Sequence, residues 1–165
     1  MKLNVKTLIP IGLTLFTSAI FLDSLRYKFT NAPETQTIFG KLDAWAASFG
    51  AEGILFSQSG IFSQYVIGTA ELIAVLLMLI GLLPRFIRFG VLGNLVGLAV
   101  MTGAISFHLF TPLGIDPNND GGLLFVMAVL VWLSQIVMLV LRRDVLRGLL
   151  RSPLSLFRAP EPRLG

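Results

Sequence analysis

The chain has 165 residues, of which 55% are hydrophobic and only 13% charged, with no cysteine and a single histidine. Soluble domains carry about 25% charged residues, so this composition and a mean hydropathy of +0.81 predict an integral membrane protein. The missing cysteines exclude disulfides, thiolate metal sites and iron–sulfur clusters, and one histidine excludes a bis-histidine haem within the chain. The net charge of +4 comes from basic residues at predicted helix ends, which favours contact with a membrane surface over nucleic acid.

The first apolar stretch, residues 8–27, has the length of a membrane-spanning helix, since about 20 helical residues cross a hydrocarbon core of about 30 Å. Its basic start followed by apolar residues is also typical of a secretory signal peptide, with a cleavage site near Ala19. The apolar run continues beyond Ala19 to Leu22. We therefore expect a retained first span rather than a cleaved leader.

Residues 30–60 are too polar to span a membrane and predict a helix along its surface. Asn31 and Glu34 have the spacing of a helix cap and a capping-box acid. The apolar residues that follow lie on one helical face: Ile38, Phe39, Leu42, Trp45, Ala46 and Phe49. An amphipathic helix that carries tryptophan favours the membrane interface. We therefore expect an outer interfacial helix between spans 1 and 2.

Two further spans are predicted at about residues 62–83 and 86–110, with Pro84 between them. Glu71 lies within the second span, and His108, the only histidine of the chain, lies near the end of the third. A charged group at the centre of a membrane costs on the order of 3 kcal/mol. Glu71 therefore needs a partner or a function.

Small residues in the third span predict close packing against a neighbouring helix. Gly93 and Gly97 are four residues apart, and so are Ala99 and Gly103; this spacing allows helix backbones to approach each other. Other polar side chains within the spans are more simply explained as interhelical hydrogen-bonding groups: Asn94, Ser106, Ser134 and Gln135.

A polar turn precedes the fourth predicted span, about residues 123–141. Asp116, Asn118 and Asp120 match the first half of a calcium-binding loop, but Met127 stands where that loop needs its bidentate glutamate. We therefore expect an Asx-rich turn, with Asp120 near the helix start, and no metal site.

The four spans form one predicted domain, residues 1–141, and residues 142–165 form a basic tail. In this tail Arg143, Arg147 and Arg151 recur every four residues, opposite apolar side chains. This pattern predicts a short basic amphipathic C-terminal helix that lies on anionic lipid.

The distribution of basic residues predicts the orientation of the four spans. Ten of the thirteen fall on one side, which is therefore cytoplasmic: Lys2, Lys6, Arg85, Arg88, Arg142, Arg143, Arg147, Arg151, Arg158 and Arg163. Arg26, Lys28 and Lys41 fall on the other. The sequence thus predicts an all-α four-transmembrane-helix bundle with both termini inside, as a multi-pass protein of a bacterial inner membrane.

This topology places four ionisable side chains in the outer half of the bundle, on stripes of small residues expected to face its interior. These candidate ligand-binding residues are Asp23, Arg26, Glu71 and His108, and Gln64 and Asn94 are expected to support them from the same stripes. Arg26 is long enough to reach Glu71, directly or through water.

Three roles remain open for this cluster. Its members either neutralise one another and fix the helix register, or bind a polar or quinone-like headgroup, or transfer protons. One histidine and two acids are few groups for catalysis, so we predict no catalytic residues. Nor do we predict a metal site or a covalently bound cofactor, and a quinone or lipid is the expected ligand.

Residues 8–141 resemble the DoxX family of small bacterial membrane proteins. The similarity is carried by FLDSLRYKF at the end of the first span and APETQTIFGKL after it, GTAELIAVLLMLIGLLPR in the second span and MTGAISFHLFTPLGID at the close of the third. The resemblance implies a four-helix bundle with Glu71 and His108 at the family's usual polar positions. Some relatives are small subunits of thiosulfate:quinone oxidoreductases, and others accompany membrane-associated oxidoreductases.

These observations together predict a non-catalytic membrane subunit or accessory protein of a redox, quinone-linked oxidoreductase system. The absence of cysteine argues against direct sulfur chemistry by this chain. The alternative is a stand-alone membrane binder or transporter of a small amphiphile such as a quinone or lipid. The expected partners are the lipid bilayer, and either other subunits of a redox complex or further copies of the chain.

Overall fold

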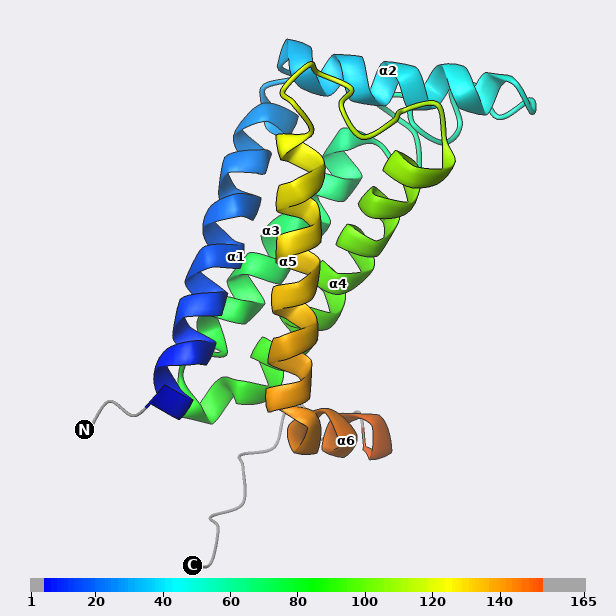
Figure 1. The fold of residues 1–165 in the computed structure, drawn as a ribbon. Coiled ribbons are helices and arrows are strands. Elements are labelled where there is room, and N and C mark those ends of the chain that lie inside the picture. The colour runs from blue at the N-terminus through cyan, green and yellow to red at the C-terminus, as the bar shows by residue number, and fades with distance from the viewer. Residues whose placement is uncertain (1–4, 153–165) are drawn as a thin grey trace, which may run out of the picture.

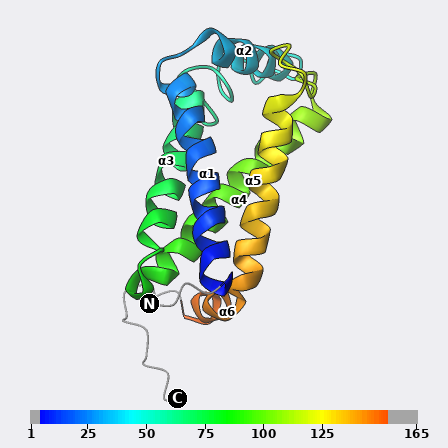
Figure 2. The same cartoon turned by 60° about the vertical axis from the view of Figure 1, so that its left-hand side comes forward.

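The computed structural model describes residues 5–152, which are α-helical and contain no β-strand. Four long helices run side by side: α1 (Val5–Phe29), α3 (Gln64–Ile80), α4 (Ile87–Phe110) and α5 (Leu123–Leu141). Contacts join α1 to α3, α3 to α4, α4 to α5 and α5 to α1, so the helices form a closed ring of neighbours (Figures 1 and 2).

Two shorter helices cover the ends of this bundle. Helix α2 (Pro33–Ala47) lies across one end and α6 (Arg143–Arg151) across the other (Figure 1), and we call these the α2 end and the α6 end. The 3₁₀ turn η1 (Pro84–Phe86) joins α3 to α4 at the α6 end. The all-helical bundle with one amphipathic helix at each end agrees with the prediction.

Within residues 5–152, three segments are long and apolar enough to cross a membrane: Leu8–Phe29, Pro84–Phe110 and Leu123–Leu141. They support a membrane protein and agree closely with the predicted spans 8–27, 86–110 and 123–141. The remaining helix, α3, has 17 residues, which is about 26 Å of helix and less than the core of about 30 Å.

The predicted second span, residues 62–83, is therefore too long at both ends. Ser63 caps α3 by accepting a 3.3 Å hydrogen bond from Val66 N, so the helix begins at Gln64. At the other end the helix stops at Ile80, before Pro84 opens η1. The count of four spans stays a prediction.

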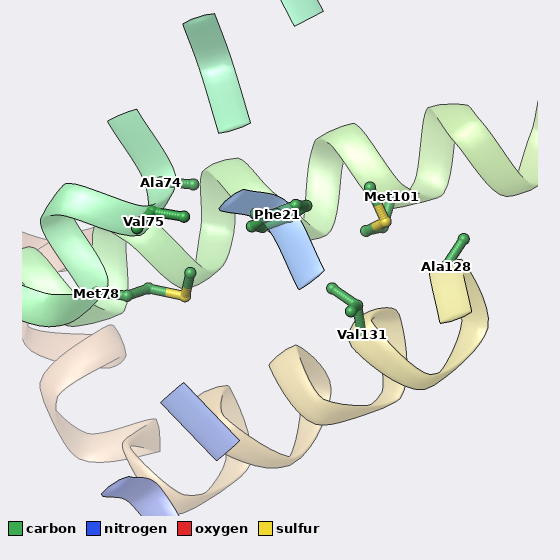
Figure 3. Close-up of a cluster of buried hydrophobic side chains, with 7 residues drawn as sticks. All are labelled: Phe21, Ala74, Val75, Met78, Met101, Ala128 and Val131. Carbon is green, nitrogen blue, oxygen red and sulfur yellow. The ribbon is translucent and has the colours of Figure 1, made fainter. Parts of the chain in front are cut away.

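The interior of the bundle is organised around Phe21 of α1, which is 1% exposed. Figure 3 shows its ring between side chains of the three other long helices: Ala74, Val75 and Met78 of α3, Met101 of α4, and Ala128 and Val131 of α5. Because lipid tails are as apolar as this core, such an aromatic side chain stabilises the bundle through close van der Waals packing. This apolar layer packs α1 against the other long helices of the bundle.

Glycines bring α3 and α4 into backbone contact, as the small-residue spacing predicted. A Cβ atom on Gly81 would lie 2.2 Å from Gly90 Cα, and one on Gly93 would lie 2.8 Å from Ala74 O. Neither position can therefore hold a larger side chain. A Cβ atom on Gly103, by contrast, would have nothing within 4 Å among the described residues, so its spacing has no packing role in this part of the chain.

Helix α2 begins differently from the prediction. Its N-cap is Ala32 and Pro33 occupies the first turn, so neither Asn31 nor Glu34 forms the predicted capping box. Asn31 instead adopts a left-handed backbone (φ 52°), a conformation that asparagine tolerates better than most residues.

The apolar face of α2 packs onto the end of the bundle, as expected of an interfacial helix. Leu42 is buried with Phe56 and with Leu113 of the loop before α5. Lys41 Nζ also donates a 3.0 Å hydrogen bond to Pro117 O in that loop. Phe49, predicted to belong to the same face, is 53% exposed because α2 ends before it.

Helix α6 forms within the predicted basic tail and crosses the α6 end beside α4 and α5 (Figure 1). Its Leu150 is 72% exposed, and Asp144 and Arg147 form an exposed ion pair at 3.6 Å. Binding of anionic lipid to this helix stays a prediction. The rest of the predicted tail, residues 153–165, and residues 1–4 lie outside the described residues.

Candidate functional site

The four predicted ligand-binding residues do not form one cluster. The structure separates them into a buried ion pair that contains Glu71, an exposed ion pair of Asp23 with Arg26, and His108 on a loop carbonyl.

Glu71 forms an ion pair with Lys28 inside the bundle. Lys28 Nζ lies 3.0 Å from both carboxylate oxygens of Glu71 and also donates to Ser24 Oγ. The Glu71 side chain is 2% exposed and that of Lys28 is 14% exposed. Because two charges taken out of water are stable only when paired and hydrogen-bonded, this pair binds α1 firmly to α3.

The lysine stem packs against α3 at Gly68. Gly68 lies about one turn from Glu71, and a Cβ atom there would be in ordinary van der Waals contact with Lys28 Cδ, at 3.5 Å. Ser24 and Lys28 are four residues apart on α1, so they share one helix face. The lysine stem thus passes over Gly68 and delivers its ammonium group between Ser24 and Glu71.

Sequence reasoning missed Lys28 and considered Arg26 as the partner of Glu71. In the sequence, Lys28 enters only the count of basic residues that predicts the orientation of the spans. Two features could have identified Lys28 as the partner of Glu71. Lys28 lies four residues from Ser24, and a long lysine stem can bury its methylenes along apolar surface. The structure corrects the partner from Arg26 to Lys28.

Asp23 and Arg26 instead pair with each other on the outside of α1. Arg26 Nη2 lies 3.0 Å from Asp23 Oδ1, and both side chains are more than 60% exposed. The Arg26 guanidinium also lies 4.5 Å from the centre of the Tyr27 ring and donates to the Tyr27 hydroxyl. Neither residue contacts Glu71 or His108 through these bonds.

His108 fixes the loop that follows α4. Its Nδ1 lies 2.6 Å from Gly114 O, and its ring meets Phe125 of α5 edge-on with 5.5 Å between centres. Because a carbonyl oxygen can only accept a hydrogen bond, Nδ1 must carry the proton. At 6% exposure, His108 serves here to hold the loop against α5.

Of the two supporting residues, only Gln64 lies beside the Glu71 network. Gln64 Nε2 donates at 2.9 Å to Lys28 O and to Asn31 Oδ1. Asn94 Nδ2 donates at 2.7 Å to Gly90 O in its own helix. Asn94 lines a small cavity of about 10 Å³ at the α6 end, so it does not support Glu71.

The buried polar side chains of α5 also differ from the prediction of interhelical hydrogen bonds. Ser134 donates to Leu130 O of its own helix at 2.8 Å. Gln135 is fully buried, and within the described chain neither its Oε1 nor its Nε2 has a hydrogen-bond partner. The amide lies against Gly97, where a Cβ atom would come within 2.0 Å of Nε2.

A pocket of about 250 Å³ lies beneath α2, next to Gln64. We call it the α2 pocket. Its polar lining residues are Asn31, Gln36, Asp43, Ser57, Gln58 and Gln64. Sequence reasoning did not predict it, because the pocket forms where α2 folds over a loop whose conformation has no periodic pattern.

Residues 5–152 contain no group of three or more histidine or acidic side chains that could hold a metal ion. No protein-family model, curated protein or solved structure matches the chain. The DoxX resemblance therefore stays a prediction that rests on the sequence pieces quoted above.

Proposed function

We propose that this chain is a non-catalytic integral-membrane subunit or accessory protein of a redox system, of the quinone-linked oxidoreductase type. The non-catalytic part is supported by one observation: the ionisable groups singled out from the sequence are engaged within the protein. Glu71 is held by Lys28, Asp23 by Arg26, and His108 by Gly114 O. The redox part rests on the DoxX resemblance.

The proposal includes four spans, with α3 as the second, in a bacterial inner membrane. Helix α3 is short, but it lies in the ring of long helices between α1 and α4, and a short span is accommodated by thinning of the bilayer at modest cost. The ten-to-three distribution of basic residues then assigns the α6 end to the cytoplasm and the α2 end to the outside.

Reporter fusions test this orientation directly. A fusion after Gly165 should be cytoplasmic, and one inserted near Asn118 should be outside. A C-terminal reporter found outside would contradict the four-span arrangement.

Purification from the source membrane tests the function. The tagged chain, solubilised in mild detergent, should recover an oxidoreductase subunit in fixed stoichiometry, recognised by mass spectrometry and by a flavin or haem absorption spectrum. A tagged unrelated membrane protein from the same cells is the control. Recovery of the chain without any redox-active subunit would contradict the proposal.

The alternative is a stand-alone binder or transporter of a small amphiphile such as a quinone or lipid. The α2 pocket supports a lipid headgroup more than a quinone, because its polar lining can both donate and accept hydrogen bonds. The pocket lies where a molecule could enter from the membrane surface in the proposed orientation. In the same purification, this alternative expects one quinone or lipid per chain and no redox subunit.

A further inference from the structure

The α2 pocket is formed by residues 31–64, from the turn before α2 to the first turn of α3. Helix α2 contributes Gln36 and Asp43, the loop before α3 contributes Ser57, and the first turn of α3 contributes Gln64. Its volume of about 250 Å³ lies below the range of about 300–1,000 Å³ found for drug-sized ligands. The pocket therefore suits a smaller molecule, of about the size of one sugar ring.

Hydrogen bonds within the chain hold the polar lining in place. Gly53 fixes two of the side chains, because its N–H donates to Asp43 Oδ1 at 3.1 Å and its carbonyl accepts from Ser57 Oγ at 2.6 Å. Gln36 Nε2 donates to Asn31 O at 2.8 Å. A binding site is effective when its polar groups are positioned in advance in this way.

These bonds use only part of each side chain. Asp43 keeps its second carboxylate oxygen, Ser57 keeps its acceptor lone pairs, and Gln36 keeps its amide oxygen. Asn31 Oδ1 accepts from Gln64, which leaves the Asn31 amide nitrogen as a donor. The pocket thus offers both donors and acceptors to a ligand.

Gln64 forms the buried side of the pocket. It is 3% exposed, and both of its hydrogen bonds use Nε2, so its Oε1 is the remaining acceptor. One of these bonds reaches the carbonyl of Lys28, whose ammonium group binds Glu71. The pocket is therefore joined to the buried ion pair through one residue.

Two phenylalanines, Phe39 and Phe56, give the pocket an apolar side. Phe56 is held in place by Phe107 edge-on at 5.1 Å and by Trp45 at 6.3 Å between ring centres. A ligand therefore needs an apolar face as well as hydrogen-bonding groups.

The lining excludes several ligand classes. It contains no lysine, arginine or histidine and has one carboxylate, Asp43, so it disfavours anions, and a multivalent cation would need more acidic ligands. Hydroxyl groups both donate and accept, which matches a lining of amides, a hydroxyl and a carboxylate. A quinone carbonyl only accepts, so it would leave the second carboxylate oxygen of Asp43, the one that Gly53 N does not reach, without a donor.

We propose that the α2 pocket binds a neutral, polyhydroxylated ring of monosaccharide size, either as a free sugar or as the headgroup of a glycolipid. The ring would place its hydroxyls against Asp43, Ser57 and Gln64 and its C–H face against the phenylalanines. This assignment is independent of the proposed redox partner, since the pocket is formed within the chain.

Tryptophan fluorescence provides the test. The full chain, with Trp132→Phe so that Trp45 is the sole reporter, is placed in phosphatidylcholine nanodiscs. D-glucose is titrated in one arm, and monoglucosyl diacylglycerol is incorporated at increasing mole fraction in the other. We expect a saturable change in Trp45 emission in at least one arm. Saturation by glucose identifies the free sugar, and saturation by the lipid alone identifies the headgroup.

Variants connect this binding to the pocket. Asp43→Asn keeps the acceptor for Gly53 N but removes the charge, and Gln64→Leu removes the buried amide. Each should raise the apparent Kd at least about tenfold, which is the affinity lost with about one hydrogen bond. Glu34→Gln is the matched control, because it removes an exposed carboxylate of α2 outside the pocket, and its Kd should be unchanged.

Three results would overturn the assignment: no saturable change in either arm, equal Kd values for wild type and Asp43→Asn, or displacement of glucose by equimolar inorganic phosphate. If Gln64→Leu fails to fold, the comparison of Asp43→Asn with Glu34→Gln still decides the matter, because both changes preserve side-chain volume.

Discussion

Two ion pairs on α1 have the same contact distance and opposite surroundings. Lys28 and Glu71 lie 3.0 Å apart and join α1 to α3, with side chains 14% and 2% exposed. Asp23 and Arg26 also lie 3.0 Å apart, but within one turn of one helix, with both side chains more than 60% exposed. Because the two distances are equal, we expect burial and connectivity to decide how much each ion pair contributes to the free energy of unfolding.

The physical reason is the energy of the unpaired state. If Glu71 or Lys28 loses its partner, a charge remains in the protein interior without water, which is costly. If Asp23 or Arg26 loses its partner, the remaining charge is solvated and screened by salt. We therefore expect the loss of stability caused by a substitution to follow the burial of the group that it changes.

The largest effect is expected at the buried pair. Glu71→Leu leaves the Lys28 ammonium unpaired and should lower the free energy of unfolding by about 3–5 kcal/mol. Lys28→Met should have a similar effect. The double variant removes both charges and replaces them with apolar side chains, so it should recover most of the loss. Thermal unfolding in one detergent compares all three with wild type.

The double variant also distinguishes a structural pair from a functional one. Recovered stability together with normal recovery of partner proteins assigns a structural role to the pair. A double variant as unstable as Glu71→Leu would contradict our account of the pair.

The buried layer offers a second comparison, between two glycines of α4. Gly97→Ala places a methyl group within 2.0 Å of Gln135 Nε2 and should cost about 1–3 kcal/mol through overpacking. Gly103→Ala meets nothing within 4 Å and should be neutral or stabilising by up to about 1 kcal/mol, since alanine favours helix. Both are measured by thermal unfolding.

Gln135→Ala in the Gly97→Ala background provides the control, because it removes the amide that the new methyl group contacts. Stability should rise relative to Gly97→Ala alone. Equal losses at both glycines would show that the close approach of Gly97 to Gln135 does not limit the packing.

The long apolar runs made most of the fold predictable from the sequence. Helix α5 begins and ends at the residues predicted for the fourth span, 123–141, and α4 begins one residue later than the predicted third span. Helix α3 is shorter at both ends than the predicted second span, because its limits depend on local contacts. Ser63 caps one end, and the close approach of Gly81 to Gly90 marks the other.

The partners within the site were less predictable, because they depend on the rotation of each helix. Arg26 and Lys28 are two residues apart and so point about 200° apart around α1. Only the contact of α1 with α3 decides which of them reaches Glu71. His108 binds Gly114 O through the fold of a loop in which Gly114 has a φ of 69°, and no periodicity predicts such a conformation.

Asp120 is an exposed acid whose partners are backbone groups, and it should have an intermediate effect. Its two oxygens accept from Gly122 N at 2.9 Å and Leu124 N at 3.0 Å at the start of α5. Asp120→Ala leaves these donors without their acceptor and should cost about 1 kcal/mol, as for a lost helix cap. Thermal unfolding at neutral pH measures the loss, and Asp116→Ala shows whether the next acid in the turn contributes.

The contribution of Asp120 should also depend on pH. Partial burial alone would raise the pKa of Asp120, but the hydrogen bonds from Leu124 and Gly122 outweigh it and lower the pKa below the ordinary value. A lowered pKa in the folded state means that the stabilisation is present above the ordinary carboxyl pKa of about 3.9 and is lost as pH falls through the lower, folded value. The gap between wild type and Asp120→Ala should therefore close only in acid below about pH 4.

The smallest effect is expected at the exposed pair, where Asp23→Asn should leave the unfolding midpoint unchanged within error. Arg26 then remains stacked on Tyr27 and open to water, so no charge is stranded. Arg26→Gln and the double variant complete a cycle whose coupling energy should be indistinguishable from zero, at low salt and at 1 M NaCl alike, because exposed pairs gain little from contact. A loss with Asp23→Asn as large as that with Glu71→Leu would show that lipid or detergent shields this face of α1 from water. The two pairs would then differ in connectivity alone, and the contrast in burial would not explain their energies.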